Sequence, residues 1–216
     1  MQESRVKYIF IVLASLSVLT GALLVTLYFA ASNVTLESLR NDAFFIYDSP
    51  IEVGEFELAD DQGQPFTRES LAGKWSLVFF GYTFCPDICP ITMASIRQFY
   101  GLLDENQDAQ DVQVIMISVD TERDTQEVLA NYVGYFNPDF IGASGEYAET
   151  YTLARQMNVT FNYTRIDDDN YLVNHNGEVM LLDPDGRNVG FFKPPYDPEQ
   201  MRVNFLRVKR FSASQQ

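Results

Sequence analysis

An uncharged run of 24 residues, from Tyr8 to Ala31, constrains this chain more than any other feature of its sequence. A helix needs about 20 apolar residues to cross the hydrocarbon core of a bilayer, so the run is long enough to span a membrane. A cleavable signal peptide is the alternative, but its apolar core normally has only about 7 to 15 residues. The length therefore favours a permanent transmembrane helix over residues 8–31.

The charges on either side of this run predict its orientation. Arg5 and Lys7 precede it, whereas the charged residues that follow are mostly acidic. Because positively charged flanks stay in the cytoplasm, residues 1–7 are expected there and the rest of the chain outside it. Residues 1–7 are also too few for the Arg-rich presequence of a mitochondrial protein. We therefore expect a single-pass protein of the bacterial inner membrane, with its C-terminal domain in the periplasm.

The chain beyond the apolar run is long enough for one domain with its own core. We expect a stalk over residues 32–50, a single domain over residues 51–208 and a short tail over residues 209–216. The net charge of the whole chain is −15, which argues against nucleic acid and anionic lipid as partners. An acidic surface aids solubility, and it can also dock a basic partner.

Hydrophobic periodicity predicts alternating strands and helices. Residues 75–80 and 112–119 are apolar runs too short for helices, and each is followed by a helical pattern, over residues 90–103 and 124–136. The other predicted elements are a hairpin near residues 55–66, a helix over 146–157, strands over 160–166, 171–174, 179–182 and 188–192, and a final helix from residue 197. This order predicts an α/β fold with a central mixed β-sheet flanked by helices.

The two cysteines, Cys85 and Cys89, are separated by three residues and lie between a predicted strand and the helix that follows it. Thiols at a helix N-terminus face exposed N–H groups and the positive end of the helix dipole. Both favour the thiolate, which is a nucleophile and a metal ligand. A structural disulfide is the alternative in an exported protein, but a loop this small would stabilise the fold by only about 2 kcal/mol. A functional pair is therefore favoured.

His175 is the only histidine of the chain and lies in a turn with Asn176 and Gly177, after the apolar run of residues 171–173. A lone histidine is usually structural, but a loop at this strand end can overhang the cysteines. Two thiolates and one imidazole form a soft donor set that suits Cu(I) and can also hold Cu(II), whereas structural zinc normally has four ligands. If the three side chains meet, copper fits better than zinc.

Three segments contain recognisable motifs, in this order along the chain: residues 80–90 (FGYTFCPDICP), residues 118–125 (SVDTERDT), and residues 171–175 (YLVNH) with residues 182–186 (LDPDG). Together they resemble the Sco (SenC) family of copper proteins. The resemblance runs from about Ile51 to Arg207 and includes the membrane anchor before it. It implies a thioredoxin-like fold and one copper ion per chain, held by Cys85, Cys89 and His175.

The same resemblance implies a copper chaperone for the copper A centre in subunit II of cytochrome c oxidase. Such a protein supplies copper to that centre or reduces its cysteines, so a copper donor and a thiol reductant are implied partners. Two positions depart from the family pattern. Phe84 stands where many members have histidine, and Asn174 stands where the family usually has aspartate, so a negative charge beside the ligand histidine is lost.

Asp87 and Asp120 are the best candidates for carboxylates that orient a ligand or tune its charge, and Asn174 is the third residue expected beside the metal. Asp120 follows a predicted strand, so a role as an ordinary turn or helix-entry residue is equally open. None of the three is expected to bind the metal itself.

Other functions remain open from the residues alone. A thiol–disulfide oxidoreductase would use Cys85 and Cys89 as its catalytic thiols without any metal. Such an enzyme needs no distant imidazole, and its usual spacing has two intervening residues, where this chain has three. A thiol peroxidase is a weaker alternative. A copper sensor or store would share every ligand with a chaperone, so whether the chain is an enzyme stays open, with a chaperone favoured.

Overall fold

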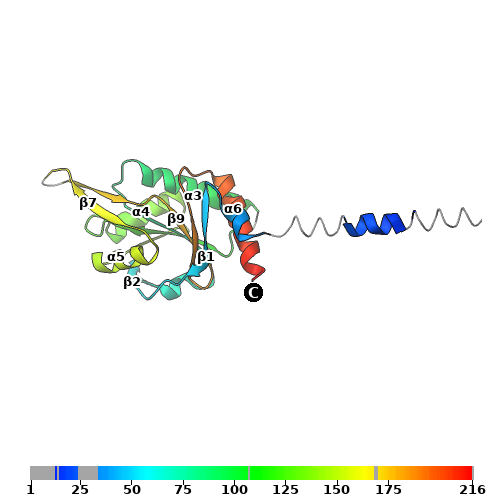
Figure 1. Ribbon diagram of the computed structural model, residues 1–216. Helices are drawn as coiled ribbons and strands as arrows, with labels where there is room; N and C mark the ends of the chain where they lie inside the picture. The colour runs from blue at the N-terminus through cyan, green and yellow to red at the C-terminus, as the bar shows by residue number, and fades with distance from the viewer. Residues whose placement is uncertain (1–12, 14, 24–33, 107, 168–169, 216) are drawn as a thin grey trace, which may run out of the picture. The chain divides into compact units, whose positions relative to one another are not determined.

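The computed structural model describes residues 13, 15–23, 34–106, 108–167 and 170–215, which form two units, Met1–Thr35 and Leu36–Gln216 (Figure 1). The expected cytoplasmic segment, residues 1–7, lies outside the described residues, as does most of the expected transmembrane helix. The described part of that helix, residues 13 and 15–23, is helical. Within the described ranges, no helix combines the length and the apolar character needed to cross a membrane.

The described strands of the larger unit are β1 (Phe44–Ile51), β2 (Glu57–Asp60), β3 (Pro65–Thr67), β4 (Trp75–Gly81), β5 (Val112–Ser118), β6 (Ile141–Ser144), β7 (Phe161–Arg165), β8 (Tyr171–His175), β9 (Val179–Leu182) and β10 (Asn188–Phe192). Eight of them form one sheet in the order β1-β10-β9-β4-β5-β6-β2-β3. β5 runs parallel to both β4 and β6, and the other neighbours in this sheet are antiparallel. The expected mixed sheet is therefore confirmed.

The helices of this unit are α2 (Leu36–Leu39), α3 (Ile88–Glu105), α4 (Gln126–Phe136), α5 (Tyr147–Gln156) and α6 (Pro198–Ala213), with a 3-10 turn over Arg68–Leu71. α3 packs against α6, where the rings of Phe99 and Phe205 meet edge to face at 5.8 Å. α6 begins where the sequence indicates, since the Asp197 side chain accepts hydrogen bonds from the backbone N–H groups of Glu199 and Gln200.

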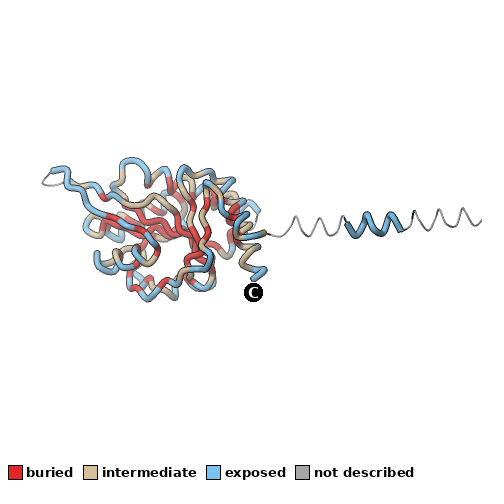
Figure 2. The backbone as a smooth tube through the Cα atoms, in the orientation of Figure 1, coloured by how far each residue is buried: buried red, intermediate tan, exposed pale blue. Residues whose placement is uncertain are grey.

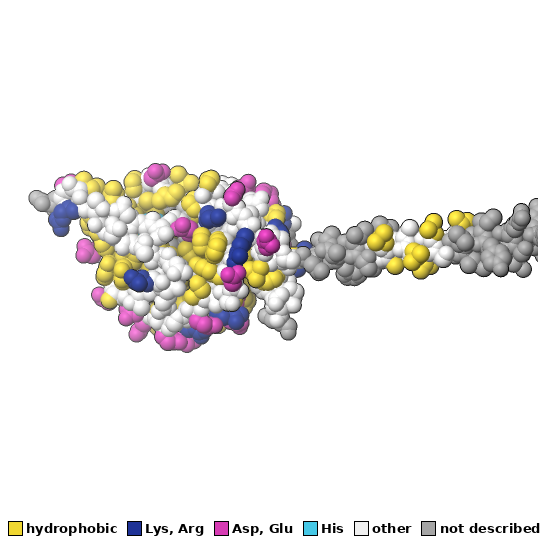
Figure 3. Space-filling model, viewed as in Figure 1, with side chains coloured by type: hydrophobic (Ala, Val, Ile, Leu, Met, Phe, Trp, Pro, Cys, Tyr) yellow, Lys and Arg dark blue, Asp and Glu magenta, His cyan; other side chains and the backbone are white. Residues whose placement is uncertain are grey.

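The core lies along the two central parallel strands. Every residue of β4 and β5 is buried, which explains why both appear in the sequence as nearly continuous apolar runs. Figure 2 shows the buried backbone concentrated in these strands and their neighbours, with exposed residues on the helices and loops around them. The face in Figure 3 carries both basic and acidic side chains among apolar ones, so the acidic excess does not form one continuous patch there.

β7 and β8 pair with each other in a separate two-stranded sheet, with Phe161 opposite His175. Figure 1 shows this hairpin extending from the body of the domain. Because its strands are not hydrogen-bonded into the large sheet, the position of the hairpin depends on side-chain contacts. This matters for the site, because β8 ends at His175.

The larger unit extends beyond the expected domain of residues 51–208 at both ends. Residues 36–50, which were expected in the stalk, belong to the fold, because Leu39 is fully buried and β1 pairs with β10 at the edge of the sheet. At the other end α6 continues to Ala213, inside the expected tail of residues 209–216. The Nζ of Lys209 lies 2.8 Å from Asp111 Oδ1, which attaches this last turn to the domain.

Candidate metal centre

The two cysteines are presented by the loop between β4 and α3. β4 ends at Gly81, the chain turns, and α3 begins at Ile88 with Asp87 at its N-cap position. Cys89 therefore lies in the first turn of the helix and is fully buried, whereas Cys85 lies in the preceding loop and is half-buried. The helix starts two residues before the expected position at Pro90, and this places the Cys89 thiol at the positive end of the helix dipole.

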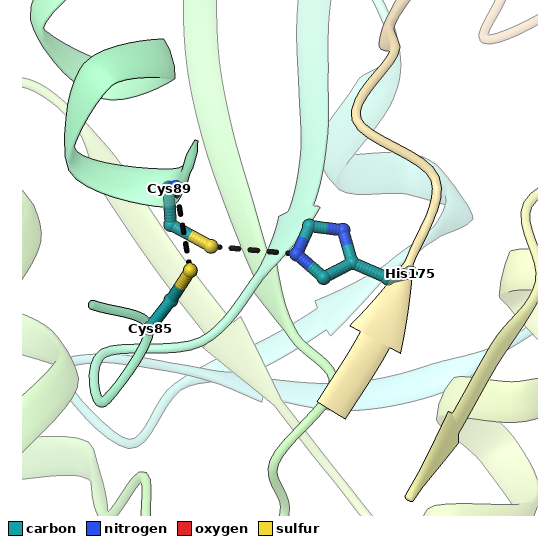
Figure 4. Close-up of side chains that lie close together, drawn as sticks. All are labelled: Cys85, Cys89 and His175. Atoms are coloured by element: carbon teal, nitrogen blue, oxygen red, sulfur yellow. Dashed lines mark hydrogen bonds between the residues drawn. The ribbon is translucent and has the colours of Figure 1, made fainter. Parts of the chain in front are cut away.

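Cys85, Cys89 and His175 converge on one point, although 86 residues separate the helix cysteine from the histidine (Figure 4). Their potential ligand atoms all lie within 4.8 Å of one another. Cys89 Sγ is 3.4 Å from His175 Nε2, and the backbone N–H of Cys89 donates to Cys85 Sγ at 3.5 Å. Both cysteines are free thiols in this structure.

The His175 ring is oriented by its own neighbours. Its Nδ1 lies 2.6 Å from the carbonyl oxygen of Asn176, and an N–H at Nδ1 donates to that oxygen. In this tautomer Nε2 carries the lone pair and faces the sulfur of Cys89, as a metal ligand requires. The rings of Phe79 and Tyr82 pack edge to face against the imidazole, with centroid distances of 5.8 Å and 6.1 Å. The imidazole is therefore presented to the cysteines before any metal arrives.

The two thiols have pKa values shifted in opposite directions. The pKa of Cys85 is lowered to about 3, first because the Cys89 thiol donates a hydrogen bond to its sulfur, and also because the backbone N–H groups of Asp87 and Cys89 stabilise the thiolate. The pKa of Cys89 is raised, first by the same hydrogen bond, which keeps the proton on Cys89, and then by burial. The pair therefore holds one negative charge and one proton at neutral pH.

We expect iodoacetamide to modify Cys85 at a nearly constant rate from about pH 5 to about pH 8, because the reactive thiolate predominates above its pKa. An ordinary thiol, with a pKa of about 8.5, reacts about tenfold more slowly for each pH unit below that value. Cys89 should stay largely unmodified, since it is buried and protonated. Mass mapping of the modified peptides measures both rates. Equal modification of the two thiols would contradict this expectation.

The side chains of the three residues expected beside the metal are either exposed or bound to other residues. Asp87 is exposed, and its side chain makes no capping hydrogen bond. Asp120 is fully buried and accepts hydrogen bonds from Tyr171 Oη and Arg123 Nε, both at 2.6 Å. The structure thus brings Cys85, Cys89 and His175 together, whereas the carboxylate of Asp120 binds Tyr171 and Arg123 and the side chain of Asp87 is exposed.

Asn174 lies on the opposite face of β8 from His175, because neighbouring side chains in a strand alternate. It is exposed, and its Nδ2 donates across the hairpin to Asn162 Oδ1 at 3.1 Å and to Thr164 Oγ1 at 2.7 Å. The amide is therefore used within the hairpin. An aspartate at this position has no N–H to offer these two oxygens.

Two residues that shape the cysteine loop were not predicted from the sequence, Asp124 and Arg123. Asp124 is buried and accepts hydrogen bonds from the backbone N–H and the hydroxyl of Thr83, at 3.0 Å and 2.6 Å, and from Ser118 Oγ at 2.6 Å. Arg123 lies beside Phe84. Both follow β5, the parallel neighbour of the cysteine strand. Their position after β5 could have predicted that they lie near the cysteine loop, because the carboxyl ends of neighbouring parallel strands meet at one edge of the sheet.

Comparison with known proteins identifies similar chains over nearly the whole length. A family model described as SCO1/SenC matches residues 47–209. A SCO2-like protein of Rickettsia typhi is 34% identical over 212 residues, which cover 96% of this chain and 99% of the relative.

Two solved structures have similar folds. The copper-bound ScoI structure of Arabidopsis thaliana is 34% identical, with a TM-score of 0.68, over 73% of this chain and 98% of that chain. The copper-bound ScoI structure of Bradyrhizobium japonicum is 37% identical, with a TM-score of 0.65, over 71% and 97% of the two chains. These similarities confirm the expected thioredoxin-like fold of the larger unit.

Proposed function

This chain belongs to the SCO1/SenC family, and we propose that it is a copper chaperone that holds one copper ion through Cys85, Cys89 and His175. The convergence of their two sulfurs and one imidazole nitrogen within 4.8 Å is the observation that supports this proposal most strongly. Two related structures are described as copper-bound. We further propose that the chain serves the copper A centre in subunit II of cytochrome c oxidase, as its family motifs imply.

The donor set fits copper better than the other common metals. Thiolate sulfur and imidazole nitrogen suit Cu(I) and can hold Cu(II), whereas magnesium and calcium need oxygen ligands. Within the described ranges, this is the only cluster of three such residues, and it contains no carboxylate. Structural zinc normally takes four protein ligands, and this site offers three.

The protonation of the site prepares it to bind a metal. Cys85 already provides a thiolate at neutral pH, so only Cys89 must release a proton when a metal ion binds. Cys85 lies in a half-buried loop, which gives a donor or acceptor protein access to the site. Three protein ligands also leave room for a thiolate of the partner, so that copper can pass between proteins by ligand exchange.

The test is an anaerobic titration of the reduced full-length chain in detergent with Cu(I), followed by mixing with an apo copper A domain. We expect one equivalent of tightly bound copper per chain and its transfer to the acceptor. Tight binding without transfer would favour a copper sensor or store. The absence of tight binding would rule out the proposed site.

A thiol–disulfide reductase is the second candidate, supported by the unequal exposure and pKa values of the two thiols. A half-exposed thiolate at Cys85 beside a buried thiol at Cys89 is an arrangement that suits a nucleophile and a resolving thiol. In this reaction the two thiols of the chain become a disulfide while a disulfide of the copper A domain becomes two thiols. Copper-free reduction of an oxidised copper A domain tests it, and His175→Ala should leave that rate unchanged.

We also propose that residues 8–31 anchor the chain in the bacterial inner membrane, with the larger unit in the periplasm. The uncharged run and the basic residues before it support this topology. Protease added to spheroplasts should digest the larger unit of a protein that otherwise stays in the membrane fraction. A soluble product that begins near residue 33 would instead indicate a cleaved signal peptide.

A further inference from the structure

The loop of residues 119–125, between β5 and α4, contacts both halves of the candidate metal site. On the cysteine side, Asp124 binds Thr83, two residues before Cys85. On the histidine side, the backbone carbonyl of Val119 accepts a hydrogen bond from Tyr163 Oη of the hairpin at 2.7 Å. We call residues 119–125 the bridging loop.

Arg123 makes the most extensive contacts of this loop. Its Nε donates to Asp120 Oδ2 at 2.6 Å, and its Nη2 also lies 2.6 Å from that oxygen. The guanidinium carbon lies 3.8 Å from the ring centroid of Tyr171 and 5.1 Å from that of Phe84. Phe84 precedes Cys85, whereas Tyr171 lies on β8, four residues before His175. One cation therefore contacts an aromatic ring on each half of the site.

Asp120 holds this cation in place. It is fully buried, and its second oxygen, Oδ1, accepts the hydroxyl hydrogen of Tyr171 at 2.6 Å. The carboxylate thus binds both Arg123 and Tyr171, so the guanidinium and the ring beneath it are fixed relative to each other. A planar guanidinium suits this role, because it can stack on aromatic rings while binding a carboxylate.

We propose that Arg123 is a positioning residue: through Asp120, Tyr171 and Phe84 it holds the His175 hairpin against the cysteine loop and sets the distance from the imidazole to the two sulfurs. The expected effect of this positioning on copper affinity rests on the proposed function. The expected effect on the surroundings of the His175 imidazole does not, since it is measured without metal.

Two features argue for positioning rather than for an ordinary surface ion pair. The hairpin is not hydrogen-bonded into the large sheet, so side chains must fix its position. Phe84 is 56% exposed, and its ring lies near the Arg123 cation instead of in the core. An ion pair between Arg123 and Asp120 that served stability alone would not need the Phe84 ring of the cysteine loop or the Tyr171 ring of the hairpin beside it.

The test uses two kinds of variant of the full-length chain in detergent. Phe84→Leu removes the exposed ring without disturbing the core, and Phe84→Trp offers Arg123 a stronger cation–π partner. The double variant Asp120→Asn/Arg123→Met removes the bridge without leaving a buried charge unpaired, which would destabilise the fold. Arg155→Met, at an exposed position on α5, is the matched control.

The first readout is the imidazole resonance of the copper-free chain labelled with carbon-13 histidine. The chain has one histidine, so the signal is unambiguous. Its position depends on the nearby rings of Phe79 and Tyr82. The second readout is copper affinity, by competition with a chelator. We expect Phe84→Leu and the double variant to shift the resonance and to lower affinity by roughly 10- to 100-fold, the usual cost of losing a residue that supports a ligand.

Phe84→Trp and Arg155→Met should behave like the wild type in both measurements. An unshifted resonance in both Phe84→Leu and the double variant would overturn the proposal. An equal loss of copper affinity in Phe84→Leu and Phe84→Trp would also overturn it. If the resonance shifts as expected but the wild type binds no copper, the positioning role stands and the proposed function fails. If copper binds tightly in every variant with an unshifted resonance, the function stands and the positioning role fails.

Discussion

Cys85→Ser is expected to abolish tight copper binding. The substitution removes the thiolate that is already charged at neutral pH and replaces it with a hydroxyl, which stays protonated and is a poor ligand for Cu(I). The loss should exceed the roughly 100-fold that removal of a supporting residue costs, because a ligand itself is lost. Competition with a copper chelator measures the affinity. Circular dichroism should show an intact fold, since Cys85 lies in a half-buried loop outside the core.

Asp87→Asn is the matched control for this variant. Asp87 lies in the same loop, is exposed and makes no side-chain capping bond, so its substitution should change affinity little. Oxidation of the pair provides an independent check. A disulfide removes both thiolates at once, so the oxidised chain should bind copper no better than Cys85→Ser. Equal affinity of the oxidised and reduced chains would show that the cysteines are not the ligands.

The central strands could be predicted because burial on both faces leaves a simple pattern. β4 and β5 are buried along their whole length, and their sequences are almost entirely apolar. β1 could not be predicted in the same way. It is an edge strand with only one well-buried end, and it contains Asp48, Ser49 and Pro50, which in isolation indicate a turn.

The cysteine half of the site could be predicted, but the reach of His175 could not. Two cysteines between a buried strand and a helix are local in sequence, and their chemistry follows from that position. His175 reaches them because the hairpin packs against the bridging loop, and contacts such as Tyr171 with Asp120 join residues 51 positions apart. No local sequence pattern predicts a contact between residues so far apart along the chain.

The orientation of Asn174 could have been predicted once His175 was assigned to the metal. Alternation along a strand sends neighbouring side chains to opposite faces, so a histidine that faces the cysteines implies an asparagine that faces away. Position along the chain alone places Asn174 beside the metal, because it precedes His175. The structure gives this amide a different role, in hydrogen bonds across the hairpin.

His175→Ala is expected to weaken copper retention sharply while leaving both thiols and the fold intact. The imidazole completes a three-ligand site, and alanine offers no donor in its place. Because Nε2 lies 3.4 Å from Cys89 Sγ, the loss acts directly on the ligand set. Copper affinity should fall by more than the roughly 100-fold expected for a supporting residue. The stability of the fold should change little, since His175 lies at the end of a two-stranded hairpin outside the large sheet.

The same variant separates a copper protein from a thiol enzyme. Disulfide exchange needs only the two cysteines, so the number of titratable thiols and the rate of reduction of an oxidised copper A domain should match the wild type. Asn174→Ala, on the opposite face of β8, is the matched control and should retain copper far better than His175→Ala. If His175→Ala holds copper with wild-type affinity, the imidazole is not a ligand, and the reductase becomes the better account of this site.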